Sequence, residues 1–523
     1  MAYPKVTYAT VQAERLDDLH RELDRTMAVL KTRVGGTYPM YVAGAPLEAD
    51  EQFDDVSPID TRVVLGRFQR GRAEHVDRAV DAARAAFPAW AALPWHHRVD
   101  VLRRFARAIH AGRLELATVM GYESGKSRIE CLGDVEEAAD LVEYYCGQFE
   151  AQNGFIQRMD SLSAQEENVS VLRPYGVWGV IAPFNFPAAL AAGPMGAALL
   201  AGNTVVFKPA TETPLVGIKL YEAAAEAGVP PGVLNVITGL GDTVGQAIID
   251  HPGIDGIVFT GSTAVGLKMI RANGRRAVPR PLILEMGGKN PALLMRSANL
   301  ENAAQGVVRS AFSAQGQKCS ACARVYVERS VKERFLEKLI EKTQNLKMGN
   351  PLERNIAIGP VINADAVRRF EAAVTQAREE GGRVLTGGRR RTEHALEHGF
   401  FVEPTVIDRI RPDSTLLQQE LFIPLTIVVE VASIDEAIEM ANNTPYGLTA
   451  GIYSEDDREI QRFLDQVHAG VLYVNRRAGA TTGAWPGVNP FGGWKASGST
   501  GRGSGGPYYV QQFMREQSRV RVR

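Results

Sequence analysis

One cysteine lies in a segment whose composition suits a nucleophile. The segment QGQKCSA places Cys319 among small polar residues, just after an expected helix over 303–314. A loop cysteine can attack a carbonyl carbon when nearby positive charge, here from Lys318, favours its thiolate. The alternative is a buried, unreactive cysteine. Cys322 completes a CxxC pair, but the sequence has no second pair with metal-ligand spacing, so we predict no metal site.

A glutamate and an asparagine could serve the same reaction. Glu285 ends the apolar run LILE, immediately before two glycines. A carboxyl group in apolar surroundings has a raised pKa and can act as a general base. Asn185 lies in the rigid turn APFNFP, where its amide could stabilise an oxyanion. The alternatives are a salt-bridged structural glutamate and an asparagine that satisfies the local backbone.

Two glycine-bearing turns suit a nucleotide. TGLGDTVG (238–245) and FTGSTAVG (259–266) each follow an expected strand and precede an expected helix, so their N–H groups could bind a pyrophosphate. Neither is a strict GxGxxG, and ordinary strand-to-helix turns are the alternative. Lys208 ends the run NTVVFK and could contact a ribose or phosphate. Glu420 and Phe422, in QQELFIPL, could bind a ribose and flank a flat ring.

The elements around these residues are expected to form two α/β lobes. Amphipathic helices begin at Ala73, and two series of short β-branched runs follow, separated by helical segments. The runs cover 177–183, 203–209, 233–239 and 256–261 in the first series, and 282–288, 290–295, 323–328, 426–432 and 470–475 in the second. This alternation predicts parallel sheets, with the boundary between the lobes near Gly287 and Gly288.

The ends of the chain and one internal segment fit neither lobe. Residues 1–50 are expected to form an N-terminal extension, with a helical charge pattern over 16–30. The polar residues 151–170 predict a hairpin or arm. The C-terminal stretch YYVQQFMREQSRVRVR alternates as an edge strand does.

Composition excludes several classes of protein. The formal net charge of −1 gives no field that would attract nucleic acid or an anionic membrane. Four cysteines in 523 residues are no disulfide framework, and the N-terminal residues lack a secretory pattern, so we expect a cytoplasmic protein. No charge occurs between Arg173 and Lys208, but four prolines there argue against a membrane helix.

Taken together, the segments resemble the aldehyde dehydrogenase superfamily from about residue 40 to the C-terminus. APFNFP, VVFKPA, FTGS, LEMGGKNP, GQKCSA, ELFIP, TPYGLTAGIY and PFGGWKASG occur in the family's order, and Glu285 and Cys319 are 34 residues apart, as in the family. The resemblance implies an aldehyde dehydrogenase-like α/β fold with a Rossmann-like cofactor domain, a catalytic domain and an oligomerisation arm that makes at least a dimer. The implied bounds are 51–146 and 171–287 for the cofactor domain, 288–484 for the catalytic domain, and 147–170 and 497–523 for the arm.

The resemblance also implies a role for each candidate residue. Cys319 would attack the aldehyde, Asn185 and the Cys319 N–H would stabilise the oxyanion, and Glu285 would activate water to hydrolyse the thioester. NAD would contact Phe184, Lys208, Thr211, Gly241, Thr260, Gly261, Ser262, Glu420 and Phe422. Thr211 stands where many NAD-preferring relatives have a glutamate, so nothing there repels a 2′-phosphate and NADP remains possible.

Within the superfamily the chain most resembles L-glutamate γ-semialdehyde (1-pyrroline-5-carboxylate) dehydrogenases of proline catabolism. It has Phe184 where most relatives have tryptophan, and Ser320 directly after the nucleophile. Ser320, Gly479 and Ala480 match the serine and backbone pair that bind the substrate's α-carboxylate in that subfamily. The following link, 481–489, is a few residues longer than usual.

Other functions remain open. The main alternative is a dehydrogenase for another aliphatic, aromatic or semialdehyde substrate. A coenzyme-A-acylating relative would lack the carboxylate that Glu285 supplies. A non-catalytic binding or structural protein would not need Cys319, Glu285 and Asn185 together, and a cysteine hydrolase would leave the nucleotide-binding turns unexplained.

Overall fold

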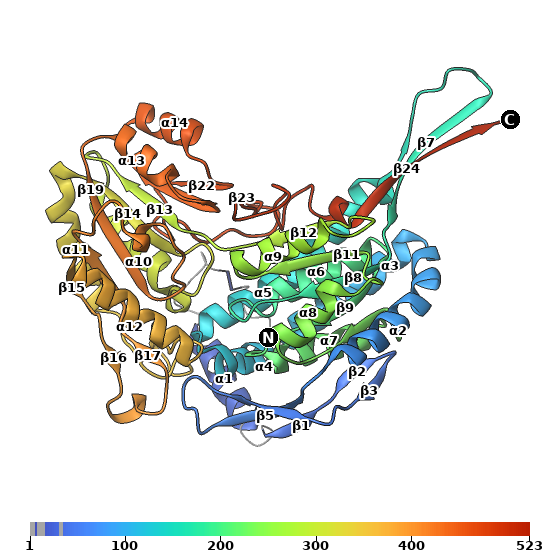
Figure 1. The fold of residues 1–523 in the computed structure, drawn as a ribbon, viewed down its shortest axis with the longest axis horizontal. Coiled ribbons are helices and arrows are strands. Elements are labelled where there is room, and N and C mark those ends of the chain that lie inside the picture. The colour runs from blue at the N-terminus through green and yellow to red at the C-terminus, as the bar shows by residue number, and fades with distance from the viewer. Residues whose placement is uncertain (1–5, 8–15, 31–34) are drawn as a thin grey trace.

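Two large sheets organise the protein. The computed structural model describes residues 6–7, 16–30 and 35–523. Figure 1 shows the large sheets in separate lobes, with a long projection of β-structure at one end. The predicted two-lobed α/β fold with an arm is confirmed. Of the predicted N-terminal extension over 1–50, residues 1–5, 8–15 and 31–34 lie outside the described part of the chain.

The first lobe is built on a seven-stranded sheet in the order β12-β11-β8-β9-β10-β2-β3. Five strands are parallel, and β2 and β3 add an antiparallel edge. The bounds are β12 Leu282–Glu285, β11 Gly256–Thr260, β8 Val177–Ile181, β9 Thr204–Lys208, β10 Leu234–Val236, β2 Met40–Val42 and β3 Ala45–Leu47. The four predicted runs from 177 to 261 are therefore strands, and their carboxyl ends share one edge.

The second lobe is built on a seven-stranded sheet in the order β15-β18-β19-β14-β13-β21-β22. Its strands are parallel except for the pair β15 and β18. The bounds are β15 Arg383–Thr386, β18 Thr405–Asp408, β19 Leu425–Val431, β14 Cys322–Glu328, β13 Asn290–Leu294, β21 Thr449–Tyr453 and β22 Val471–Val474. The chain passes from the first sheet to the second between Glu285 and Asn290, at the two glycines.

Helices cover both faces of the sheets. In the first lobe these are α2 Ala73–Ala92, α3 Trp95–Ala111, α4 Arg113–Ser124, α5 Arg128–Ala151, α6 Ala189–Leu200, α7 Pro214–Glu226, α8 Gln246–Asp250 and α9 Thr263–Asn273. In the second lobe they are α10 Leu300–Phe312, α11 Lys332–Gln344, α12 Ala364–Glu379, α13 Ile434–Asn442 and α14 Asp457–Gln466. No helix among the described residues is long and apolar enough to span a membrane.

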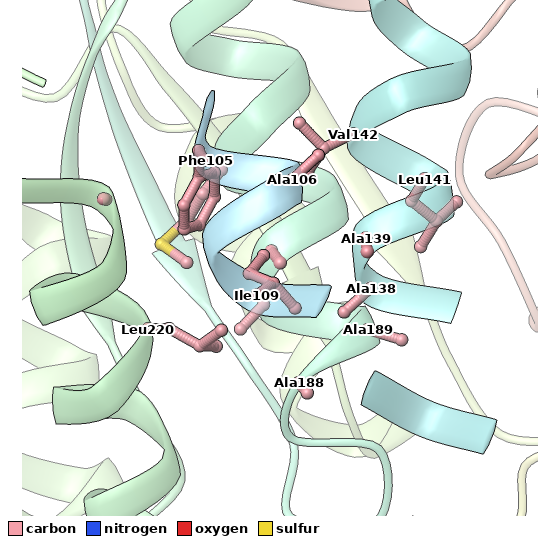
Figure 2. Close-up of a cluster of buried hydrophobic side chains, with 14 of the residues drawn as sticks. Phe105, Ala106, Ile109, Ala138, Ala139, Leu141, Val142, Ala188, Ala189 and Leu220 are labelled. Carbon is pink, nitrogen blue, oxygen red and sulfur yellow. The ribbon is translucent and has the colours of Figure 1, made fainter. Parts of the chain in front are cut away.

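The core of the first lobe is closely packed around α5. Small residues of α6, such as Ala189, lie beside Ala138 of α5, while Phe105 and Ile109 of α3 pack from the other side (Figure 2). Helix α5 begins with a capping box, in which Ser127 and Glu130 satisfy each other's backbone N–H groups. The cap and the buried apolar face fix α5, which also lines the candidate active site described below.

The projecting arm has different bounds from those expected. Strand β24 (Met514–Val522) pairs along its whole length with β7 (Glu166–Pro174), and β7 also pairs with β6 (Ile156–Arg158). Helix α5 continues to Ala151, so the arm begins later than residue 147. Tyr509 and Phe513 are buried in the first lobe, so most of 497–513 belongs to the body.

Residues before the first lobe's helices also join its body. Helix α1 (Leu16–Leu30) contacts α4, and Asp24 of α1 forms an ion pair with Arg128, with an Oδ1–Nη2 distance of 2.6 Å. Strands β1 (Gly36–Tyr38), β5 (Val64–Gln69) and β4 (Gln52–Val56) form a separate three-stranded sheet, in that order.

Candidate active site

A tightly constrained loop presents Cys319. After α10 the chain takes left-handed backbone conformations at Ala314 and Gln315, which ends the helix and turns the chain toward β14. The Asn290 side-chain amide donates to the Cys319 carbonyl at 2.8 Å. A Cβ atom at Gly288 would lie 2.4 Å from that same carbonyl oxygen, so glycine permits the close approach of the two lobes' backbones.

The Cys319 thiol is protonated until a base removes its proton. Burial raises the pKa of the thiol well above its usual range, and the carboxylates of Glu420 and Glu285 raise it further. The positive charge expected from Lys318 does not offset this effect. The Lys318 Nζ lies 3.8 Å from Glu130 Oε1 instead, within an ion pair.

Glu285 has the environment of a general base. It lies buried at the carboxyl end of β12, and burial raises its pKa to about 7, against the opposing effect of the Ser504 N–H. Its Oε1 has no hydrogen-bond partner among the described residues. A carboxyl group that is about half ionised near neutral pH, with one oxygen free, can accept a proton from water.

A buried ion pair positions Asn185. The Lys126 Nζ donates to the Asn185 backbone carbonyl at 2.9 Å and lies 2.8 Å from Asp134 Oδ2, and Asp134 also accepts from the Ala189 N–H. The Asn185 Nδ2 donates to the Gln317 carbonyl, at 2.9 Å, two residues before the cysteine. One of its two amide hydrogens is therefore left for an oxyanion.

The predicted cofactor residues gather at the carboxyl edge of the first sheet. Lys208 ends β9, where its buried Nζ donates to the Pro209 carbonyl and burial lowers its pKa to about 8. Thr211 Oγ1 donates to the Gly239 carbonyl at 3.2 Å. The exposed Gly241 begins the next turn.

The start of α9 suits a pyrophosphate. Thr260 ends β11, Gly261 follows with its N–H bonded to the Glu285 carbonyl, and Ser262 caps α9 by accepting from the Val265 N–H. The N-terminal end of an 11-residue helix carries partial positive charge, and Ser262 leaves it exposed to solvent.

Glu420 and Phe422 lie between this edge and the cysteine. The Gly288 N–H donates to Glu420 Oε1 at 3.0 Å, and burial raises the Glu420 pKa to about 7. Phe422 has a left-handed backbone, with φ of 57°, which turns its ring edge-on to Phe184 at a centroid distance of 5.9 Å. A strained non-glycine residue beside a candidate site is typical of a functional constraint.

The cysteine opens onto a cavity that is continuous with solvent. Its wall combines charged and apolar side chains from α5, α6, α10 and four loop segments, at 186, 313–320, 478–491 and 504–505. The lining residues are Ile129, Glu130, Glu137, Leu141, Phe186, Ala189, Leu190, Arg309, Ser313, Lys318, Cys319, Ser320, Ala478, Thr482, Gly483, Ala484, Trp485, Pro486, Asn489, Phe491, Ser504 and Gly505.

The backbone pair expected to bind a carboxylate lies elsewhere in the loop. The Gly479 N–H donates to the Arg476 carbonyl and the Ala480 N–H to the Gly306 carbonyl, so neither is free, and neither residue lines the cavity. Gly483 and Ala484 line it beside Ser320, and no described residue accepts a hydrogen bond from their N–H groups.

The sequence contained a signal for this second pair. Gly483 and Ala484 repeat the Gly-Ala pair four residues later, and they bring the link to PFGG back toward the shorter length expected of the subfamily. The geometry therefore makes Gly483 and Ala484, rather than Gly479 and Ala480, the candidate backbone pair for binding a carboxylate. We call this pair the cradle.

Known proteins share this architecture and these segments. A model of the aldehyde dehydrogenase family matches residues 46–518. A 1-pyrroline-5-carboxylate dehydrogenase of Geobacillus sp. (strain WCH70) is 35% identical over 97% of this chain and 96% of its own. The crystal structure of a Thermus 1-pyrroline-5-carboxylate dehydrogenase with bound NAD superposes with a TM-score of 0.94, at 33% identity, over 100% of this chain and 99% of that chain.

A relative with another named substrate matches at the same level. A 3,6-anhydro-alpha-L-galactose dehydrogenase of Vibrio sp. (strain EJY3) is 35% identical over 92% of this chain and 98% of its own. The family match over nearly the whole chain agrees with the placement of Cys319, Glu285 and Asn185 around one cavity. The chain belongs to the aldehyde dehydrogenase family.

Proposed function

We propose that this chain oxidises L-glutamate γ-semialdehyde to L-glutamate with NAD as the hydride acceptor. The observation that carries the proposal is that Ser320 and the Gly483–Ala484 pair, whose N–H groups have no acceptor among the described residues, line the same cavity as the nucleophile. Hydroxyl and N–H donors suit a carboxylate, and Glu137 in the same wall suits the substrate's ammonium group. The relatives named 1-pyrroline-5-carboxylate dehydrogenase support the same substrate, whereas the 3,6-anhydro-alpha-L-galactose dehydrogenase is named for a sugar aldehyde.

The reaction follows from the groups around Cys319. The Cys319 thiol gives up its proton to solvent in the open cavity, and the resulting thiolate forms a C–S bond with the aldehyde carbon. The free Asn185 amide hydrogen and the Cys319 N–H stabilise the resulting oxyanion. The oxyanion reforms its C=O bond as hydride leaves, which produces a thioester on Cys319. NAD, held at the edge of the first sheet, would supply the hydride acceptor for this step. Glu285 then takes a proton from water, whose oxygen attacks the thioester and releases the acid.

The cofactor site in this proposal is the carboxyl edge of the first sheet. Ser262 and Gly261 would bind the pyrophosphate at the start of α9, and Glu420 and Phe422 would position the nicotinamide ribose and ring. The adenosine half would lie along Lys208, Thr211, Gly241 and Thr260, whereas Phe184, whose ring meets that of Phe422, would lie on the nicotinamide side. Thr211 carries no charge to repel the 2′-phosphate of NADP, but the Glu212 carboxylate that follows it acts on the neighbouring Lys208, so a negative charge remains near this end of the site.

The domain assignments are part of the same proposal. The cofactor domain would span 51–146 and 171–287, joined by β1–β3, and the catalytic domain 288–484. The arm presents β24 with a free edge, and we expect it to pair with another copy to give a dimer or larger assembly. Four free cysteines agree with a reducing cytoplasm. Light scattering of the purified chain tests the assembly, and a monomer would contradict it.

The test of the substrate is a comparison of aldehydes. The formation of NADH and of NADPH is followed by absorbance with glutamate γ-semialdehyde, succinate semialdehyde, hexanal, benzaldehyde and a sugar aldehyde. We expect kcat/KM for the first to exceed the others by about a hundredfold, roughly 2.7 kcal/mol. Ser320→Ala should reduce this preference. A flat or reversed order would contradict the proposed substrate and leave the dehydrogenase chemistry intact.

A further inference from the structure

The long loop over 476–489 is fastened at both ends. At its inner end, the Arg476 guanidinium donates to the carbonyls of Thr482 and Gly483 at 2.9 and 2.7 Å, and it stacks 4.9 Å from the centre of the Tyr473 ring. At its outer end, the Gly487 N–H donates to the Gly505 carbonyl at 2.9 Å. The loop therefore forms a fixed wall of the cavity, and the cradle pair, Gly483 and Ala484, lies in its middle.

Trp485 joins this loop to helix α5. The indole Nε1 donates to Asp140 Oδ2 at 2.8 Å, across 345 residues of sequence. Asp140 directly precedes Leu141, which lines the cavity and is visible on α5 in Figure 2. A tight turn follows the tryptophan, because the N–H groups of Val488 and Asn489 both donate to the Trp485 carbonyl at 3.0 Å.

The tryptophan also closes an apolar part of the cavity. Trp485 and Pro486 line the wall together with Ile129, Leu141, Phe186 and Leu190. Trp485 follows the cradle residue Ala484 directly in the sequence, and both residues line the cavity onto which Cys319 opens. An indole ring is the largest side chain available, and a hydrogen bond that fixes its orientation makes it a rigid boundary.

We propose that Trp485, tethered to α5 by Asp140, sets the longest aldehyde that the cavity accepts. Substrates with a tail no longer than glutamate γ-semialdehyde fit between Cys319 and the ring, and longer tails collide with it. The inference rests on the proposed function in one respect, namely that the substrate's tail extends from Cys319 toward the cradle and Trp485. Simple alkanals test it independently, because they have no carboxylate for the cradle to bind.

The experiment compares kcat/KM for propanal, hexanal and decanal, with NAD, in the wild type and in variants. We expect Trp485→Ala to raise the decanal-to-propanal ratio at least tenfold. Asp140→Ala should raise it by a smaller factor, because the ring stays but is no longer fixed. Asp140→Asn keeps an oxygen that can accept from the indole, so it should restore the wild-type ratio.

The matched control is Trp494→Ala, which removes a half-exposed tryptophan outside the cavity and should leave the ratio within twofold of wild type. Thermal unfolding checks that each variant is folded. If Trp485→Ala does not fold, the test is the comparison of the decanal-to-propanal ratio of Asp140→Ala with that of Asp140→Asn. The proposal would be overturned if Trp485→Ala left the decanal-to-propanal ratio unchanged, or if neither Asp140 variant changed it. A shifted ratio with no activity on glutamate γ-semialdehyde would keep it and refute only the proposed substrate.

Discussion

Replacing Glu285 with glutamine separates the two halves of the reaction. The side chain keeps its shape but loses the ability to accept a proton. Hydride transfer should still occur once per Cys319, and thioester hydrolysis should slow by about 10²–10⁴-fold, the range expected when a general base is removed. Stopped-flow absorbance should therefore show a burst of one NADH per site and then almost no turnover.

The pH profile of the wild type gives the expected size of the effect of Glu285 ionisation on the hydrolysis rate. Burial raises the Glu285 pKa from 4.5 to about 7, so roughly half of the enzyme has an ionised base at pH 7 and about one-tenth at pH 6. Hydrolysis requires the ionised form, so its rate should fall about fivefold between pH 7 and pH 6 and rise about twofold by pH 8.

Two results would refute this account of Glu285. One is steady turnover by Glu285→Gln near the wild-type rate. The other is a hydrolysis rate that stays flat from about pH 5.5 to 8 in single-turnover experiments. Glu137→Gln is a useful control, because Glu137 lines the same cavity but has no part in the hydrolysis proposed. It should retain the burst and the steady rate with an alkanal substrate.

Three further predictions follow from the site and the core. Cys319→Ala should abolish dehydrogenase activity while NAD still binds by calorimetry; activity within about tenfold of wild type would be inconsistent with the mechanism. Asn185→Ala should lower the rate of the NADH burst by about 10²–10³-fold, through loss of one oxyanion donor, and an unchanged burst would exclude that role. Burial raises the pKa of Glu123 to about 8, from 4.5, beside the buried Asp55. Because the folded pKa is the higher one, this stabilising contribution is complete below about pH 4.5 and is lost as the pH rises to about 8. Glu123→Gln, which cannot ionise, should therefore flatten the decline in Tm between about pH 4.5 and 8; an identical decline would contradict the raised pKa of Glu123.

The sequence predicted the repeating elements because their signal is local. Runs such as 177–183 and 256–261 are short, β-branched and bounded by glycine or proline, and each forms a strand within two residues of its expected ends. The strands between Gly36 and Gln69 were missed. Strands β1 and β4 are short and largely exposed, and β5, although mostly buried, is interrupted by a glycine and an arginine. Their pairing depends on partners in the folded lobe more than on their own residues.

The same distinction between local and distant signals applies to the residues of the candidate site. Cys319, Glu285 and Asn185 carry recognisable neighbours, whereas the fixed positions of these side chains depend on contacts distant in sequence. The Lys126–Asp134 ion pair behind Asn185 and the hydrogen bond between Trp485 and Asp140 have no local signature. The choice of the Gly-Ala pair that could bind a carboxylate required the structure, because it depends on which N–H groups already donate to other carbonyls.

The most direct test of the central claim is to capture the acyl-enzyme. Glu285→Gln protein is mixed with NAD and glutamate γ-semialdehyde, and its peptides are analysed by mass spectrometry. We predict that the peptide containing Cys319 gains the mass of the aldehyde less two hydrogens, in the same amount as the NADH released. NADH formation without an adduct on Cys319, or with the adduct on another cysteine such as the buried Cys322, would contradict the proposed chemistry.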